Sequence, residues 1–242
     1  MEAVILAGGY AKRMWPYTLD KSKVLLDMGG RPVIDHILDK ILPLKPLKIL
    51  VSTNRKFGAD FEKWASIKGM ANLEVVEEIS SLEGKKLGSI GALDFIIRSR
   101  KIDDDLLVVA GDNMFDFSLG MFISAAGGRP AVGLYEIAER EKATSLGVVE
   151  IDVKGRITGF EEKPQHPKST LIATGIYFFP KKTIRFISEY LEGGNNPDAP
   201  GHFIAWLHKK QDVFGIVMGG KWIDIGSMES YERAKREFGM RG

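Results

Sequence analysis

The sequence predicts a mixed α/β domain whose mostly parallel sheet is flanked by helices. Apolar strand-like runs alternate with helix-like segments through the first half of the chain, an order typical of βαβ units. The first apolar run opens directly into paired glycines. No proline- or serine-rich linker interrupts the 242 residues, so we expect one domain.

The expected elements follow in chain order. Strand-like runs rich in apolar residues predict strands at residues 4–6, 49–52, 73–76 and 106–110, and helical spacing predicts helices at 33–42, 57–67 and 91–97. The second half begins with a hairpin of residues 147–151 and 157–162 around Lys154-Gly155. A strand at 171–179, a helix at 181–191, a loop at 193–197, a helix at 203–209, strands at 213–218 and 222–225 and a helix at 230–238 complete the expected order.

Composition excludes several classes of protein. Apolar residues make up 44% and charged residues 27% of the chain, as is usual for globular proteins. A net charge of +2 gives no support for a nucleic-acid surface, and the absence of cysteine excludes disulfides and thiolate chemistry. The start lacks the pattern of a signal peptide, and no apolar run reaches membrane-spanning length. We therefore expect a cytoplasmic protein without nucleic-acid or membrane partners.

The glycine turn after the first strand is the strongest motif. Gly8 and Gly9 follow the apolar run, and Arg13 and Lys23 lie beyond. Backbone N–H groups that no side chain covers can approach phosphate oxygens, and the cations add positive charge. Gly8-Gly9 alone is equally compatible with an ordinary turn beside solvated cations. The joint spacing of glycines, arginine, proline and lysine favours a polyphosphate site.

Two aspartates are candidate metal ligands. Asp112 follows the apolar run 106–110, at the sheet edge where α/β proteins bind ligands, and a carboxylate there suits Mg²⁺. Asp224 interrupts an apolar run, and a buried carboxylate needs a metal or partner. Capping of the next turn by Asp112 and of a helix near Ser227 by Asp224 are the alternatives. Two carboxylates that are far apart in sequence but lie on one edge of a sheet can share a metal ion, and the sequence alone does not show that these two meet.

Residues 161–164 end a strand in two carboxylates, a cation and a proline. Lys163 can contact a phosphate, and Glu162 can accept hydrogen bonds from sugar hydroxyls. A solvated charge cluster is the alternative.

Other motifs fail. The dinucleotide fingerprint is absent after the first strand, and the second strand ends without an acidic residue, which disfavours a nicotinamide dehydrogenase. A near match to a phosphate loop at residues 215–221 leads to Trp222 where Ser or Thr should hold magnesium. The four histidines show no metal-ligand spacing.

Together these residues resemble the sugar-1-phosphate nucleotidyltransferases, with the glucose-1-phosphate thymidylyltransferase branch most similar. The motifs occur in the family's order over almost the whole chain. They are residues 6–9 with Arg13, Pro16, Thr18 and Lys23, then residues 30–34, 87–92, 111–115, 147–149, 161–164, 174–177 and 222–226. The resemblance implies a Rossmann-like catalytic domain over residues 1–242, with a nucleotide half to about residue 115 and a sugar-phosphate half from about residue 116.

The resemblance implies Mg²⁺-dependent transfer of a nucleotidyl group from a nucleoside triphosphate, dTTP or UTP being favoured, to a hexose 1-phosphate such as glucose 1-phosphate. A homo-oligomer is compatible with it. The implied catalytic residues are Arg13, Lys23, Asp112 and Asp224, of which Asp112 and Asp224 hold the metal. The implied nucleotide-binding residues are Leu6, Ala7, Gly8, Gly9, Lys12, Glu83, Gly88 and Ser89. The implied sugar-phosphate-binding residues are Asn113, Gly147, Glu162, Lys163, Thr174 and Tyr177.

Two departures and three alternatives stay open. Ala11 stands where the family usually has a third glycine and fits if its φ is negative, while Lys12 replaces Ser or Thr and adds a charge.

A GTP-dependent, mannose-1-phosphate-type guanylyltransferase is one alternative, because Glu83 offers a carboxylate to the guanine N–H groups. A non-catalytic nucleotide-sugar-binding regulatory subunit and a transferase for a phosphorylated polyol or choline-like alcohol are the others.

Overall fold

The structure, a computed structural model, describes residues 1–78 and 87–239 of the chain. These residues form two compact units. Unit 1 takes its residues from Met1–Lys86, Val109–Phe117 and Gly220–Gly242, and unit 2 from Leu87–Val108 and Ser118–Gly219. Each unit therefore combines segments that lie far apart in sequence, and neither coincides with a half of the chain.

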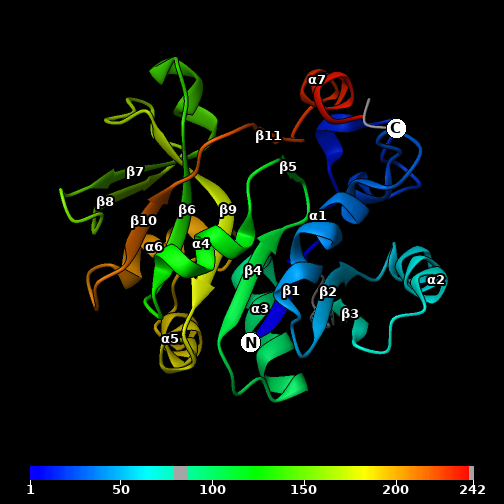
Figure 1. The fold of residues 1–242 in the computed structure, drawn as a ribbon, viewed down its shortest axis with the longest axis horizontal. Coiled ribbons are helices and arrows are strands. Elements are labelled where there is room, and N and C mark those ends of the chain that lie inside the picture. Colours follow the sequence, from blue (N-terminus) through cyan, green and yellow to red (C-terminus); the bar gives the residue numbers. More distant parts are fainter. Residues whose placement is uncertain (79–86, 240–242) are drawn as a thin grey trace. The chain divides into compact units, whose positions relative to one another are not determined.

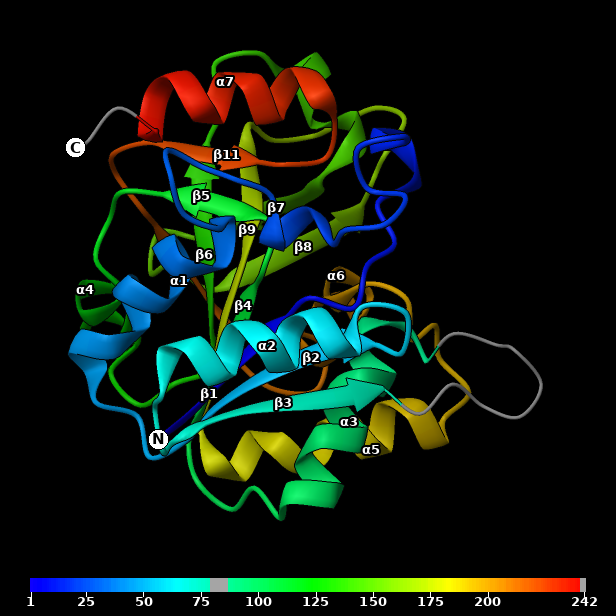
Figure 2. The ribbon, with the colours of Figure 1, turned by 90° about the vertical axis from the view of Figure 1, so that its right-hand side faces the viewer.

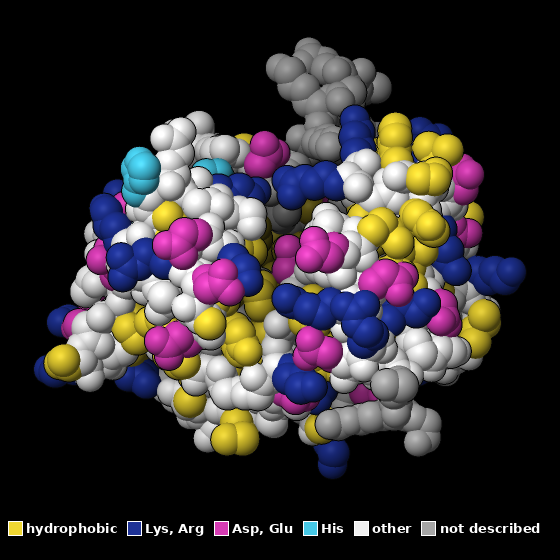
Figure 3. Space-filling model, turned by 90° about the horizontal axis from the view of Figure 1, so that it is seen from above, with side chains coloured by type: hydrophobic (Ala, Val, Ile, Leu, Met, Phe, Trp, Pro, Cys, Tyr) yellow, Lys and Arg dark blue, Asp and Glu magenta, His cyan; other side chains and the backbone are white. Residues whose placement is uncertain are grey.

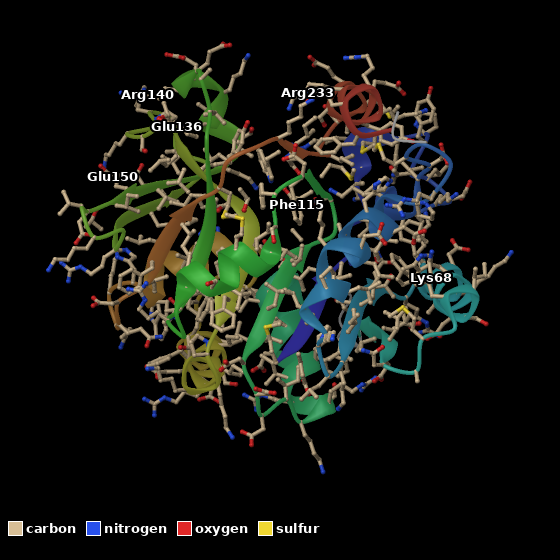
Figure 4. All side chains as sticks on the ribbon, viewed as in Figure 1. Lys68, Phe115, Glu136, Arg140, Glu150 and Arg233 are labelled. Carbon is tan, nitrogen blue, oxygen red and sulfur yellow. The ribbon has the colours of Figure 1, made fainter. Side chains whose placement is uncertain are left out.

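Unit 1 contains a parallel sheet of β1 (Glu2–Leu6), β2 (Ile49–Asn54) and β3 (Leu73–Glu78). Every residue of β2 is buried, as expected for a strand with both faces covered. Helix α1 (Val33–Ile41) follows the glycine turn, and α2 (Gly58–Lys68) lies along the sheet (Figure 2). Figure 4 labels Lys68 at the end of α2, where its ammonium group pairs with Asp35 of α1 at 2.5 Å. The Lys68–Asp35 pair ties the two helices together.

A second layer of unit 1 is built from the two later segments. Strand β5 (Asn113–Phe115) pairs antiparallel with β11 (Trp222–Asp224), so that Phe115, labelled in Figure 4, faces Trp222. Helix α7 (Met228–Phe238) follows and begins with a Ser227 capping box. These elements share an apolar core with the turn after β1, which consists of Met14, Met28, Val33, Met114, Ile223, Ile225, Tyr231 and Ala234.

Unit 2 contains the strand order β10-β6-β9-β4. Strand β10 (Phe214–Val217) is parallel to β6 (Ala131–Glu136), which is antiparallel to β9 (Leu171–Phe179). Strand β4 (Leu106–Ala110) carries the chain into unit 1. The hairpin of β7 (Gly147–Ile151) and β8 (Ile157–Glu162) joins through Val148 opposite Ile172 of β9.

Four helices complete unit 2 (Figure 1): α3 (Gly88–Arg100), α4 (Leu119–Ala126), α5 (Lys181–Glu192) and α6 (Pro200–Leu207). Aromatic side chains pack α5 onto α6, with the Tyr190 ring 5.4 Å from Phe203 and 5.6 Å from Trp206. Short 3₁₀ turns at Lys12–Met14, Lys23–Leu25, Leu42–Leu44 and Arg140–Ser145 lie between the larger elements of the two units.

The predicted fold class, a mixed and mostly parallel sheet with flanking helices, is confirmed. The elements at residues 113–115, 119–126 and 131–136 were missed. Among the described residues, the predicted strand at residues 222–225 pairs with β5 in a separate two-stranded sheet. None of the helices in the described ranges is long and apolar enough to cross a membrane. On the face drawn in Figure 3, basic and acidic side chains are intermixed, without a large patch of one sign.

Candidate nucleotide and metal site

The glycine turn is fixed by backbone hydrogen bonds at the end of β1. The Ala7 N–H donates to the Ser52 carbonyl at 2.9 Å, and the Gly111 N–H donates to the Leu6 carbonyl at 2.8 Å. A Cβ on Gly111 would lie 2.9 Å from that Leu6 oxygen. Glycine at this position therefore lets the backbone before Asp112 lie directly against the turn.

Glu78, which the sequence reasoning did not single out, lies beside the glycine turn. Its Oε1 accepts a hydrogen bond from the Ser52 hydroxyl at 2.7 Å, and a Cβ on Gly8 would lie 2.0 Å from the same oxygen. Asn54 holds the turn from the same edge, because its Nδ2 donates to the Gly8 carbonyl at 2.9 Å. Burial raises the pKa of the Glu78 carboxyl, and the hydrogen bond from Ser52 opposes that rise. Gly8 thus leaves room for the Glu78 carboxyl group, which a side chain at this position would displace.

The basic residues of the turn lie on the surface of unit 1. Lys12 and Arg13 are exposed and belong to a 3₁₀ turn. Ala11 caps that turn with φ 46° and ψ 44°, so the negative φ on which its fit depended is not found. A residue other than glycine in this left-handed region costs about 1–3 kcal/mol. The Thr18 hydroxyl, which donates to the Ala11 carbonyl at 2.8 Å, helps to hold it there.

Lys23 contacts Asp112 directly. The Lys23 ammonium group pairs with Oδ2 of Asp112 and donates to the Ile225 carbonyl at 3.3 Å. The side chains of Lys23 and Asp112 are 15% and 28% exposed, so both are partly accessible from solvent. The lysine that the sequence placed on phosphate and the aspartate that it placed on metal are thus neighbours.

Asp112 and Asp224 are brought together by strand pairing within unit 1. Asp224 lies opposite Asn113 in the antiparallel register of β5 and β11, and the Ile225 N–H donates to the Asp112 carbonyl at 2.8 Å. The carboxylate oxygen of Asp224 lies on the Gly226 side, where a Cβ on Gly226 would approach it to 3.0 Å.

Asn113 follows Asp112 in sequence and lies directly opposite Asp224 in the strand register. Its Nδ2 donates to Oδ1 of Asp112 at 3.0 Å, while its buried Oδ1 has no hydrogen-bond partner within the described ranges. A buried acceptor without a hydrogen-bond partner lowers the stability of the folded state by about 1–3 kcal/mol. A bound ligand or ion at this oxygen would offset that cost.

The donor set fits a hard divalent cation. Across residues 1–78 and 87–239, no group of three or more histidine, aspartate or glutamate side chains is placed to hold a metal. Two carboxylates and one unpaired amide oxygen nevertheless suit Mg²⁺, which takes few protein oxygens and completes its shell with water and phosphate.

In unit 2, Glu162 is held between two glycines. A Cβ on Gly147 would lie 3.1 Å from its Oε2, and a Cβ on Gly201 of α6 would lie 1.9 Å from it. The carboxylate therefore sits at the first turn of α6, where the positive end of the helix dipole favours negative charge. The Lys163 ammonium group lies 3.7 Å from Glu162 and is half exposed. Gly147, Glu162 and Lys163 thus form one cluster.

Thr174 and Tyr177, the other residues implied for the sugar, are buried in β9. Thr174 is fully buried and its hydroxyl donates to the Gly133 carbonyl at 2.8 Å. Tyr177 is 4% exposed, and its ring stacks on Phe179 at 6.0 Å. Their contact with a sugar stays a prediction, and the Thr174 hydroxyl is already used within the sheet.

Gly88 and Ser89 begin α3 in unit 2. Gly88 has φ +72°, and a Cβ there would lie 2.4 Å from the Pro197 carbonyl oxygen. The Ile90 N–H donates to that carbonyl at 2.9 Å, and the Ser89 N–H donates to the Asp198 carbonyl at 3.3 Å. Close backbone packing therefore accounts for Gly88. Glu83, the residue implied for the base, lies outside the described residues.

Comparison with known proteins identifies the family. The nucleotidyl transferase family model matches residues 2–239. A "Bifunctional protein GlmU" of Methanocaldococcus jannaschii is 30% identical over 231 residues, which is 93% of this chain and 51% of that protein. A glucose-1-phosphate thymidylyltransferase of Neisseria meningitidis is 28% identical, over 97% of this chain and 81% of that one. A putative mannose-1-phosphate guanyltransferase of Sulfolobus acidocaldarius is 26% identical, over 98% of this chain and 63% of that one.

The fold is shared with solved structures. A putative glucose-1-phosphate thymidylyltransferase from Bacillus anthracis superposes with a TM-score of 0.85 at 24% identity, over all of this chain and 96% of that one. The chain spans about half the length of some of the curated relatives it matches. On the match over residues 2–239, the chain belongs to the nucleotidyl transferase family.

Proposed function

We propose that the chain catalyses Mg²⁺-dependent transfer of a nucleotidyl group from dTTP or UTP to a hexose 1-phosphate, with glucose 1-phosphate as the acceptor. The observation that carries the proposal is the cluster of Lys23, Asp112 and Asp224, assembled from three distant segments at the glycine turn. Similar proteins named for glucose 1-phosphate, with thymidylyl or uridylyl transfer, support these substrates.

The reaction requires charge neutralisation more than proton transfer. An oxygen of the sugar phosphate attacks the α-phosphorus of the triphosphate, a new P–O bond forms, the α–β bridging P–O bond breaks, and pyrophosphate leaves. The nucleophile is already an anion, so no strong general base is needed, and alignment with electrostatic stabilisation supplies the rate. Mg²⁺, held by Asp112 and Asp224, would screen the charge of the phosphates.

The chain's own residues divide the remaining work. The backbone N–H groups of the glycine turn and the exposed cations Lys12 and Arg13 suit the triphosphate. Lys23 has a pair of acceptors in Asp112 and Ile225 and can exchange one of them for a phosphate oxygen.

At the acceptor end, Glu162 is fixed between Gly147 and Gly201 and suits sugar hydroxyls. Lys163 beside it suits the sugar phosphate. A carboxylate that accepts hydrogen bonds from hydroxyl groups and an ammonium group that neutralises phosphate are the partners that suit a hexose 1-phosphate.

Guanylyl transfer is the second candidate, and Glu78 is the observation that favours it. When ionised, its carboxyl group beside Gly8 can accept two adjacent N–H donors. Guanine offers such a pair on N1 and N2, whereas thymine and uracil offer one N–H between two carbonyl groups. One relative is named a putative mannose-1-phosphate guanyltransferase.

The test is a matrix of triphosphates (dTTP, UTP, GTP, ATP and CTP) against glucose, mannose and N-acetylglucosamine 1-phosphates, with pyrophosphate release and product mass as readouts. We expect turnover with dTTP or UTP and glucose 1-phosphate, and its loss in Asp112→Asn. Preferred turnover with GTP and mannose 1-phosphate would replace the first candidate by the second. Tight nucleotide-sugar binding without turnover for any pair would show a non-catalytic protein and contradict both.

A further inference from the structure

The amide of Asn113 is oriented by its neighbours. Asn113 is the first residue of β5 and is 4% exposed. Its Nδ2 donates to Oδ1 of Asp112 at 3.0 Å, and its Oδ1 has no partner within the described ranges. Rotating the amide by half a turn would place its carbonyl oxygen against the Asp112 carboxylate, where two acceptors repel each other. The unpaired oxygen therefore belongs to the position in which the structure has it.

The unpaired oxygen belongs to the same cluster as the two aspartates. Asp224 is the cross-strand neighbour of Asn113, and side chains of directly opposed antiparallel residues leave the same face of a sheet. Asp112, the preceding residue, is bonded to the Asn113 amide on one carboxylate oxygen and to Lys23 on the other. All of these residues lie in unit 1.

We propose that Oδ1 of Asn113 is a third protein ligand of the divalent cation held by Asp112 and Asp224. The amide then has two tasks, because its nitrogen orients Asp112 while its oxygen binds the metal. Neutral carbonyl oxygens of asparagine are suitable ligands for hard cations. The proposal rests on the metal site of the proposed function and adds one ligand to it.

A neutral third ligand also fits the charge of the site. Two carboxylates balance the charge of one divalent cation. A third carboxylate in the same place would repel the incoming triphosphate, and this repulsion is strong where solvent is partly excluded. An amide supplies the oxygen without that repulsion.

The first experiment measures Mn²⁺ binding by the electron paramagnetic resonance signal of the free ion, with the nucleoside triphosphate present and absent. We expect Asn113→Ala to weaken Mn²⁺ binding at least tenfold. We expect Asn113→Asp to bind Mn²⁺ alone at least as tightly as the wild-type chain but to bind the triphosphate more weakly. Asp112→Asn, which removes a proposed ligand, should lose the Mn²⁺ site.

The second experiment uses the absence of cysteine from the chain. Asn113→Cys places the only thiol at the proposed ligand position, and thiolates favour soft metals. We expect Cd²⁺ to produce a sulfur-to-metal charge-transfer absorption in Asn113→Cys. Met114→Cys is the matched control, because Met114 is the next residue of β5 and packs into the apolar core. It should give no such band.

The outcomes separate this proposal from the metal site itself. If wild-type chain binds Mn²⁺, Asp112→Asn does not, and Asn113→Ala binds it normally, the metal site stands and the role of Asn113 is refuted. That role is refuted as well if Asn113→Ala raises only the KM for sugar phosphate, or if Cd²⁺ gives no band in Asn113→Cys. Wild-type chain that binds no Mn²⁺ even with triphosphate refutes both the metal site and its third ligand.

Discussion

Replacing Gly88 by alanine should destabilise unit 2 through a clash with backbone. Gly88 has φ +72°, and the added Cβ would lie 2.4 Å from the carbonyl oxygen and 2.6 Å from the carbonyl carbon of Pro197. The left-handed conformation alone costs an alanine about 1–2 kcal/mol. Forcing the two backbones apart adds about 1–3 kcal/mol, because no flexible side chain can move away. We expect Gly88→Ala to lower the free energy of unfolding by about 3 kcal/mol.

Gly194 provides the matched control for this prediction. It has φ +73° in the same unit, and a Cβ there would have nothing within 4 Å. Gly194→Ala therefore reports the conformational cost alone, and Gly88→Ala should lose about 2 kcal/mol more, or about 4–8 °C in Tm for a chain of this size. Urea and thermal unfolding followed by circular dichroism give both values. Equal losses in the two variants would refute the packing argument. An increased KM for the triphosphate without loss of stability would instead assign Gly88 to the base alone.

Three further changes test the described contacts. Glu78→Gln should raise stability at neutral pH, because the raised pKa of Glu78 means that the folded state ionises this carboxyl less readily than the unfolded chain. The difference in unfolding free energy between Glu78→Gln and wild type should grow as the pH rises from the ordinary glutamate pKa to the raised pKa of Glu78. It should vanish at pH values below both pKa values. Exposed Glu74→Gln is the control, and a pH-independent difference in urea titrations would contradict the assignment. Thr174→Val should cost about 1 kcal/mol by leaving the Gly133 carbonyl without its hydroxyl donor, with an unchanged KM for sugar phosphate; a raised KM at full stability would place the hydroxyl on the sugar. Lys163→Met should raise the KM for sugar phosphate about tenfold, because it removes the cation proposed to bind the phosphate. The stability should change little, because the half-exposed ammonium group makes only a 3.7 Å pair. Unaltered kinetics would remove Lys163 from the acceptor site.

The sequence predicted the elements whose patterns are local and strong. Strand β2 begins with three consecutive apolar residues, and α5 is clearly amphipathic, so both were found, although β2 extends two residues beyond its predicted end. Strand β6 was missed because Gly133 interrupts its short apolar run. Strand β5 has only three residues, and its pairing with β11 comes from segments far apart in sequence.

The candidate site was predicted in part for the same reason. Asp112 and Asp224 were singled out because a carboxylate stands out beside an apolar run, and the register of β5 and β11 places Asp224 opposite Asn113, the residue after Asp112. Their role as metal ligands stays a prediction. Glu78 gave no such signal, because it is one of two adjacent glutamates at a strand end. Only the packing of β3 against the turn shows its carboxyl group beside Gly8.

The most direct test of the central claim is anomalous diffraction from crystals of the chain soaked with Mn²⁺ and the triphosphate that turns over. We expect one anomalous peak at coordination distance, about 2.1 Å for an ion of this class, from a carboxylate oxygen of both Asp112 and Asp224. A peak bound to neither aspartate, or to only one of them with the other turned away, would contradict a shared metal site.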